Sequence, residues 1–185
     1  NFEIEYLIYT NLLTSAFYLF FITTRDFIKK KANNLPQNLA HFGFSLLMLS
    51  ILLNNIFSSE VITNLKVGDT FKSEKFKINF INIYQEQEQN FKAIRGKISV
   101  EGPKGVVEFF YPELRIYNQP NIVTSEADIK TNLFTDKFIT MNSVQNQEYF
   151  NIRYQNKPLM IWIWISTLII SLGGFFSLVK KKNEN

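Results

Sequence analysis

The stretch from Leu39 to Phe57 reads LAHFGFSLLMLSILLNNIF, and it carries no Asp, Glu, Lys or Arg. Its length approaches the roughly 20 apolar residues that an α-helix needs to cross a bilayer. The same stretch holds His41, the only histidine of the chain. An ionisable side chain at the mouth of a membrane span is a candidate functional residue, and a neutral imidazole is a common axial ligand of haem iron. This stretch therefore sets both the fold class and the first candidate site.

Two further apolar blocks, at 6–23 and 159–179, flank this central stretch. Basic residues follow the first block at Arg25 and 29–31, and follow the last block at 180–182. Positively charged loops stay on the matrix or cytoplasmic side of a membrane, so both basic segments are expected there. The sequence therefore predicts a membrane protein with three transmembrane α-helices. A small β-rich extramembrane domain is inserted between helices two and three, on the opposite side of the membrane.

The expected divisions follow from these blocks. We expect transmembrane helices at 1–24, 38–57 and 157–179, a basic connector at 25–37, a β-rich domain at 58–156 and a basic tail at 180–185. Pro36 suits the first turn of the second helix, where its missing N–H costs nothing. Trp162 and Trp164 suit the membrane interface at the start of the third helix, and Lys180 with its two neighbours should end it.

Alternating apolar residues predict strands between the second and third blocks. Along 75–84 the side chains of Phe76, Ile78 and Phe80 fall on one face. A second strand is expected over 93–100, a turn at 101–105, and a short helix or a loop over 125–134. In total, about five or six short strands would form one small domain.

Composition excludes several classes of protein. The chain has no cysteine, so disulfides, thiolate metal ligands and cysteine nucleophiles are excluded. The net charge of +4 is small and sits at the ends of the apolar blocks, which argues against nucleic-acid binding. No phosphate-binding loop, zinc pattern or Ser/His/Asp arrangement is present. Because the sequence begins with Asn1 rather than Met, we expect a processed chain or part of a longer one.

Four motifs in order resemble the C-terminal part of CcmF, the haem-lyase subunit of the cytochrome c maturation system. They are PQNLAHFG at 36–43, YPELRIY at 111–117, TSEADI at 124–129 followed by FTD at 134–136, and KPLMIWIW at 157–164 followed by LGG at 172–174. The third motif has an inserted Ser125, and Phe138 stands where the family tends to have Tyr. The tryptophan-rich haem-handling segment of the family is missing from this sequence.

The resemblance implies a function in haem attachment to c-type cytochromes. It implies that His41 is an axial ligand of a transmembrane haem b that reduces the substrate haem. Because the chain has no other histidine, the second ligand would come from an N-terminal CcmF-type subunit or the remainder of the same protein. Gly43, close to His41, would leave room for the flat macrocycle. Other implied partners are a haem-delivery protein of the maturation system, apocytochrome c and membrane lipid.

The resemblance also implies a place in the cell. The expected location is the mitochondrial inner membrane, with the β-rich domain in the intermembrane space, as in mitochondria that encode this protein in two parts. In a bacterium the corresponding places are the plasma membrane and the periplasm. No catalytic residue can be identified from the sequence, so any enzymatic role of this chain would be as a subunit of the lyase.

Each candidate residue has a second, structural interpretation. His41 could be an interfacial histidine bonded to a headgroup or a carbonyl. Arg115 could contact a haem propionate or the substrate, or form a structural ion pair with Glu113. Glu126, Asp128 and Asp136 are interpreted as caps and surface groups. The whole chain could be a non-catalytic structural subunit of a large membrane complex. A transporter or channel is disfavoured, because the apolar blocks carry no formal charge.

Overall fold

Three long α-helices and ten β-strands make up the part of the chain that the structure describes. The computed structural model describes residues 2–29, 35–103, 105–144 and 148–184. The helices are α1 (Phe2–Ile28), α2 (Leu35–Phe57) and α3 (Met160–Glu184), and the strands lie between α2 and α3. This order confirms the predicted fold class. The three helices are long and apolar enough to cross a membrane over Tyr6–Ile28, Leu35–Phe57 and Met160–Lys180.

The helix ends differ from those expected by a few residues. Helix α1 continues through Arg25 to Ile28, beyond the expected end at 24. Helix α2 begins at Leu35, which places Pro36 in its first turn. The apolar span of the third helix ends at Lys180, while α3 itself continues to Glu184, because lysine is a good helix former and is favoured at the C-terminal end of a helix dipole. Of the basic connector expected at 25–37, residues 30–34 lie outside the described residues, while 25–28 belong to α1 and 35–37 to α2.

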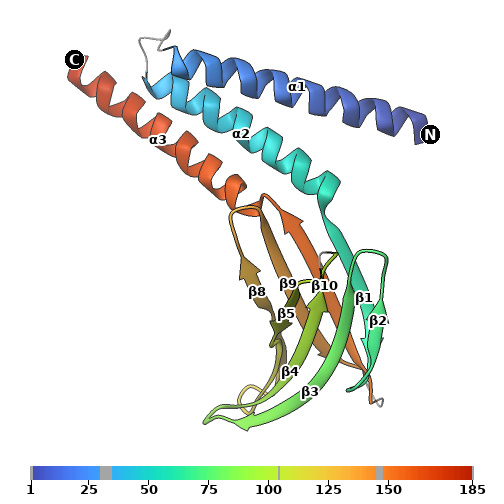
Figure 1. Ribbon diagram of the computed structural model, residues 1–185. Helices are drawn as coiled ribbons and strands as arrows, with labels where there is room; N and C mark the ends of the chain where they lie inside the picture. The colour runs from blue at the N-terminus through green and yellow to red at the C-terminus, as the bar shows by residue number, and fades with distance from the viewer. Residues whose placement is uncertain (1, 30–34, 104, 145–147, 185) are drawn as a thin grey trace. The chain divides into compact units, whose positions relative to one another are not determined.

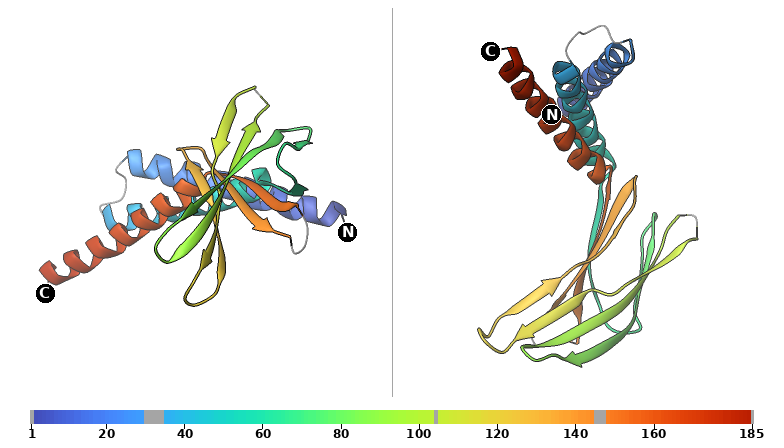
Figure 2. Two further views of the ribbon diagram at one scale, coloured as in Figure 1. Left: turned by 90° about the horizontal axis from the view of Figure 1, so that it is seen from below. Right: turned by 90° about the vertical axis from the view of Figure 1, so that its left-hand side faces the viewer.

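Helix α2 lies between α1 and α3 (Figures 1 and 2). Two glycines allow α2 and α3 to approach closely. A Cβ added at Gly43 of α2 would lie 2.8 Å from Cγ1 of Ile170, and one at Gly173 of α3 would lie 2.9 Å from the backbone N of Ala40. Small residues at such crossings let helix backbones pack in the absence of a hydrophobic driving force.

Aromatic rings and hydroxyl groups join α2 to α1. The Phe42 ring packs against Phe20 and Phe27, with centroid distances of 5.9 and 5.7 Å. The hydroxyls of Thr23 and Ser45 are 2.8 Å apart. Helix α2 is therefore held on two sides, by rings and a hydrogen bond toward α1 and by glycines toward α3.

The strands form two antiparallel sheets. One sheet has the order β1-β10-β9-β8, and the other has the order β2-β3-β4-β6-β7 with β5 paired to β4. In Figure 1 the pair β3 and β4 forms a long curved hairpin. The strands are β1 (Ser59–Leu65), β2 (Thr70–Lys72), β3 (Lys77–Gln87), β4 (Phe91–Glu101), β5 (Val107–Phe110), β6 (Glu113–Tyr117), β7 (Val123–Glu126), β8 (Asp128–Thr131), β9 (Thr135–Ser143) and β10 (Phe150–Pro158).

The inner faces of both sheets supply one apolar core. The predicted alternation along 75–84 is present, since Ile78 and Phe80 are fully buried and Phe76 packs against them. A register shift between Phe80 and Asn82 then moves the apolar face by one residue, so that Ile83 joins the core. The other core residues are Leu65, Ile98, Val100, Phe110, Leu114, Ile139, Met141, Ile152 and Tyr154.

Two expectations about this domain were wrong. Residues 125–134 were expected to form a short helix or a loop, but most of them lie in β7 and β8. The expected number of strands was also too low. The short strands at 59–65, 70–72, 123–126 and 128–131 have little apolar alternation of their own, and each is defined by pairing with a longer neighbour.

Candidate functional site

His41 lies in the second turn of α2, and its side chain is exposed. The buried residues of this helix are Gly43, Ser45, Leu49 and Ser50. Of these, Gly43 packs against Ile170 of α3 and Ser45 bonds to Thr23 of α1, whereas the imidazole of His41 is exposed. The only histidine of the chain is thus presented on the outer surface of the helix bundle, where another polypeptide or lipid can reach it.

The space beside Gly43 is taken by α3. A side chain at this position would meet Ile169 and Ile170. The expectation that Gly43 leaves room for a macrocycle was therefore wrong, because the glycine serves helix packing. A haem ligated by His41 would have to lie on the exposed side of α2.

The basic residues after α1 are only partly described. Lys29 is exposed at the end of the helix, and Lys30 and Lys31 lie outside the described residues. Arg25 pairs with its neighbour Asp26 at 3.2 Å. This pair is exposed, so it contributes little to stability.

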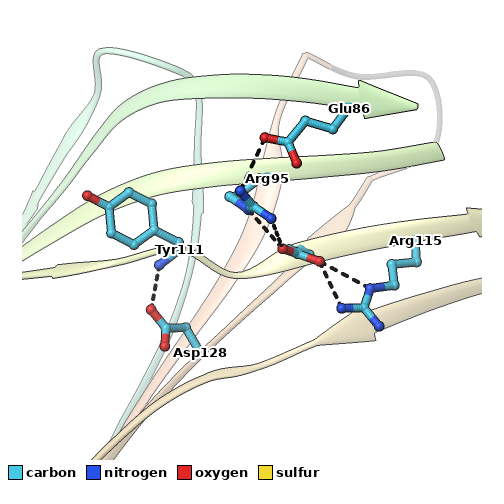
Figure 3. Close-up of polar contacts among 6 residues, drawn as sticks. Glu86, Arg95, Tyr111, Arg115 and Asp128 are labelled. Atoms are coloured by element: carbon cyan, nitrogen blue, oxygen red, sulfur yellow. Dashed lines mark hydrogen bonds and ion pairs between the residues drawn. The ribbon is translucent and has the colours of Figure 1, made fainter. Parts of the chain in front are cut away.

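A second candidate site is the Glu113 cluster, which consists of Glu86, Arg95, Glu113 and Arg115 on one face of the six-stranded sheet (Figure 3). Arg95 is the cross-strand neighbour of Glu113, and its Nη2 lies 2.6 Å from Oε1 of that carboxylate. Arg115 binds the other oxygen, with Nη2 3.0 Å from Oε2. Glu86 closes the row with an ion pair to Arg95 at 3.2 Å. The structural ion pair between Glu113 and Arg115 is therefore present.

Charge and burial act in opposite directions on Glu113. Burial alone would raise the pKa of its carboxyl, but the hydrogen bonds from Arg95 and Arg115 outweigh burial and lower that pKa. The same bonds to Glu113 raise the pKa of both arginines. Arg115 also lies over the Phe91 ring at 5.1 Å. Both guanidinium groups are held in place by these contacts.

A shallow hollow of about 570 Å³ lies over this cluster. Tyr111, Glu126, Ala127 and Asp128 line it together with Arg95, Glu113 and Arg115. Asp128 accepts a hydrogen bond from the backbone N–H of Tyr111 at 2.7 Å, and Glu126 accepts one from the Thr124 hydroxyl at 3.2 Å. With three carboxylates against two guanidinium groups, the hollow is not a strong site for an anion. Contact between Arg115 and a haem propionate stays a prediction.

Asp136 is not the surface group that the sequence suggested. It is 8% exposed, and its Oδ1 has no hydrogen-bond partner within the described part of the chain. The sequence gives no signal that Asp136 is buried, because buried and less buried residues do not alternate regularly at the start of β9. Glu126 and Asp128 are in strands rather than at helix ends.

The two tryptophans of α3 have different roles. Trp162 donates a hydrogen bond from Nε1 to the backbone carbonyl of Leu133 at 2.8 Å, while Trp164 is 66% exposed. Asn54, near the end of α2, donates a side-chain hydrogen bond to the carbonyl of Pro158 just before α3. Sequence reasoning missed both contacts, because each joins residues far apart in the chain.

The described residues contain no group of three or more His, Cys, Asp or Glu side chains that could hold a metal ion. A single exposed imidazole is therefore the candidate ligand that this part of the chain offers to an iron. Such a donor can supply one of the two axial positions of a haem.

Comparison with known proteins finds several relatives. A family model described as the CcmF C-terminal beta-sandwich matches residues 56–158. A cytochrome c-type biogenesis protein, ccl1, of Rhodobacter capsulatus is 27% identical over 143 residues, which cover 77% of this chain and 22% of that protein. The cytochrome c-type biogenesis protein CcmF of Pseudomonas aeruginosa is 23% identical, covering 79% of this chain and 22% of that protein.

Two further matches bear on the fold and on the source. An uncharacterized mitochondrial protein, ymf2, of Marchantia polymorpha is 36% identical over 73 residues, which cover 38% of this chain. A solved structure of the cytochrome c haem lyase CcmF superposes with a TM-score of 0.58 at 17% identity, over 77% of this chain and 24% of that one. That likeness shows a shared fold. The chain spans about a quarter or less of the length of these curated relatives and of the solved structure.

Proposed function

This chain belongs to the family of the CcmF C-terminal β-sandwich, and from that premise we propose that it is a subunit of a cytochrome c haem lyase. The wider membership in cytochrome c biogenesis rests on the family match and on relatives named for that process. The reaction attaches haem covalently: each cysteine S–H of an apocytochrome adds across a haem vinyl group and forms a thioether. No atom leaves in this addition.

Within that function, the proposed role of His41 is to ligate a transmembrane haem b. The observation that carries this role is the exposure of His41 on α2, beside residues that are buried against α1 and α3. An imidazole that faces outward can share an iron with a ligand from another polypeptide. The one histidine of the sequence fits one axial position of a haem with two histidine ligands. A haem held in this way supplies one-electron transfer that keeps the substrate haem reduced.

The proposed partners are the polypeptide that supplies the second axial ligand and the proteins that bring haem and apocytochrome. A second histidine ligand would come from an N-terminal CcmF-type polypeptide or from the remainder of the same protein, since His41 is the only histidine of this sequence. The β-sandwich, on the outer side of the membrane, would face the apocytochrome and the haem-delivery protein. Similarity to a mitochondrial protein of Marchantia polymorpha supports the mitochondrial inner membrane as the location.

The test is a spectrum of the chain purified together with its partner polypeptides. The wild-type complex should show a b-type reduced-minus-oxidised difference spectrum, and His41→Ala should lose it and stop cytochrome c maturation. Imidazole added to His41→Ala should restore part of the b-type absorbance, because a free imidazole can occupy the vacated position. Gln37→Ala is the matched control, since Gln37 is exposed one turn earlier on the same helix.

The outcomes separate the lyase from a purely structural subunit. If His41→Ala leaves both the b-type absorbance and maturation unchanged, the ligand role is wrong. If maturation also survives deletion of the β-sandwich while the complex still assembles, the chain is a structural subunit. Loss of the spectrum in both His41→Ala and Gln37→Ala would indicate misassembly of α2 and would contradict a specific ligand role.

A further inference from the structure

The turn between β8 and β9 is built by the side chain of Asn132. Its Oδ1 accepts hydrogen bonds from the backbone N–H groups of Phe134 and Thr135, both at 2.9 Å. The backbone N–H of Asn132 also donates to the carbonyl of Thr135 at 3.1 Å. Such an Asx-type turn leaves the two residues at its tip, Leu133 and Phe134, in a fixed conformation.

Two hydrogen bonds hold this turn against the start of α3 (Figure 1). Trp162 donates from its indole N–H to the carbonyl of Leu133, and the backbone N–H of Leu159 donates to the carbonyl of Phe134, both at 2.8 Å. Leu159 has a positive φ of 59°, which turns the chain from β10 into the helix. Residues 132–136 accordingly belong to the same compact unit as the three helices.

The side chains at the tip of the turn are nevertheless exposed. Leu133 is 58% exposed and Phe134 is 70% exposed, although both of their backbone carbonyls accept hydrogen bonds. Trp164, one turn into α3, is 66% exposed. Three large apolar side chains near the start of α3 therefore take little part in the packing of this unit.

The level of the turn relative to a bilayer follows from the length of α3. Its apolar span, Met160–Lys180, has 21 residues, which at about 1.5 Å per residue matches a hydrocarbon core of about 30 Å. The first turn of α3 then lies at the boundary between hydrocarbon and headgroups. Asn54, near the end of α2, bonds to the carbonyl of Pro158 and brings the end of the second span to the same level.

We propose that the turn Asn132–Phe134 is a lipid-binding element that inserts Leu133 and Phe134 into the membrane–water interface at the start of α3, beside Trp164. Aromatic rings are favoured at this depth, and the turn carries no charged side chain that would oppose insertion. The hydrogen bonds from Trp162 and Leu159 satisfy the two carbonyls that would otherwise enter the boundary without partners. Its partner is the lipid surface.

The absence of cysteine from the sequence makes a direct test possible. A nitroxide label is placed on the single-cysteine variants Leu133→Cys and Phe134→Cys, and the chain is reconstituted in lipid nanodiscs with its co-purified partner polypeptides. Collisions with oxygen, which partitions into lipid, are compared with collisions with a water-soluble nickel chelate. Ile122→Cys is the control, because Ile122 is 48% exposed in the connection between β6 and β7.

The ratio of oxygen to nickel collisions should be severalfold higher at 133 and 134 than at 122. A ratio equal to that of the control would place the turn in water and overturn the proposal. Low collision rates with both reagents would place it against a protein partner, which would also overturn the proposal.

A second variant tests the role of the indole hydrogen bond. Trp162→Phe keeps a ring but removes the N–H, so a label at 134 should become more mobile and its oxygen-to-nickel ratio should fall. Trp164→Phe is the matched control and should leave the mobility at 134 unchanged. If Trp162→Phe also changes nothing, the turn is not positioned by this bond and the proposed anchoring is wrong.

Discussion

The helical part and the β-sandwich of this chain bury their apolar residues to very different degrees. In an apolar stretch of 18 residues within each of α1, α2 and α3, only 6%, 22% and 11% of the residues are buried within the chain. The β-sandwich, by contrast, encloses a core in which Ile78, Phe80, Ile98 and Ile139 are fully buried. The sandwich is complete by itself, whereas the helices offer most of their apolar surface to lipid and to other polypeptides.

The largest effect should come from the core of the sandwich. Phe80→Ala removes a fully buried ring that contacts Phe150, and we expect it to cost roughly 3–5 kcal/mol in the free energy of unfolding. Denaturant unfolding of the sandwich, followed by near-ultraviolet circular dichroism, measures this loss. Val107→Ala, at a 47% exposed position of β5, should change it by less than about 0.5 kcal/mol. A similar cost for both variants would contradict a self-contained core.

The next effect concerns the close approach of α2 and α3 at Gly173. At Gly173 an added Cβ would meet the backbone of Ala40 and Pro36 at 2.9 Å, and backbone atoms cannot move aside cheaply. Gly173→Ala should therefore separate α2 from α3 at a cost of about 1–3 kcal/mol. The detergent concentration at which helix packing is lost gives the measurement.

Gly174→Ala is the control for this prediction, because nothing lies within 4 Å of its added Cβ. It should be neutral or slightly stabilising, since alanine is the better helix former. Equal losses in the two variants would mean that the glycines do not set the distance between α2 and α3.

A smaller and pH-dependent effect is expected at Glu113. Its pKa lies below the ordinary value of 4.5, so its contribution to stability is complete above that value and is lost as the pH falls through the lowered pKa. Glu113→Gln should remove roughly 1 kcal/mol at neutral pH, because the two arginines are about one-third exposed and their ion pairs are partly screened.

The measurement is the unfolding free energy of the sandwich from pH 7 down to pH 3. Wild type should lose stability in the acid range more steeply than Glu113→Gln, which lacks the carboxylate. Glu74→Gln, at an exposed position in the connection before β3, should behave like wild type. Parallel curves for wild type and Glu113→Gln would show that protonation of Glu113 does not affect the stability of the sandwich.

The smallest effect on stability should come from the exposed face of α1. Phe21 is 65% exposed, so Phe21→Ala should leave the unfolding of the isolated chain unchanged within about 0.5 kcal/mol. The same variant should reduce the yield of partner polypeptides that co-purify with the chain. Phe20→Ala, which removes a ring packed on Phe42, should instead weaken α1–α2 packing. Unchanged partner yield with Phe21→Ala would show that lipid alone covers this face.

The sequence was sufficient for features that depend on one segment at a time. Long uncharged runs predicted the three helices, and the alternation at Ile78 and Phe80 predicted strand β3 and its buried face. Features that depend on two distant segments could not be predicted. Strands β7 and β8 need the pairing of their neighbours, and the burial of Asp136 needs the surrounding fold.

Gly43 and Trp162 illustrate the same limit within the candidate sites. A glycine near a histidine can leave space for a ligand or for another helix, and only the packing of α3 against it distinguishes the two. A tryptophan at a helix start is expected at the interface, but its hydrogen bond to Leu133 depends on a turn about 30 residues earlier in the chain. For His41, the sequence predicted that any second histidine ligand must come from elsewhere, and the ligand role itself stays a prediction.

The contact between Gly43 and Ile170 has a consequence for the direction of the imidazole. Successive residues of an α-helix are rotated by about 100°, so His41 points about 200° away from Gly43 around the axis of α2. Because the close approach of Ile170 leaves no room for a Cβ at position 43, the packing of α3 fixes the rotation of α2 about its axis with Gly43 toward α3. The direction of the His41 side chain is therefore set by the packing of Gly43 on the opposite side of α2, and no other polypeptide is needed to set it.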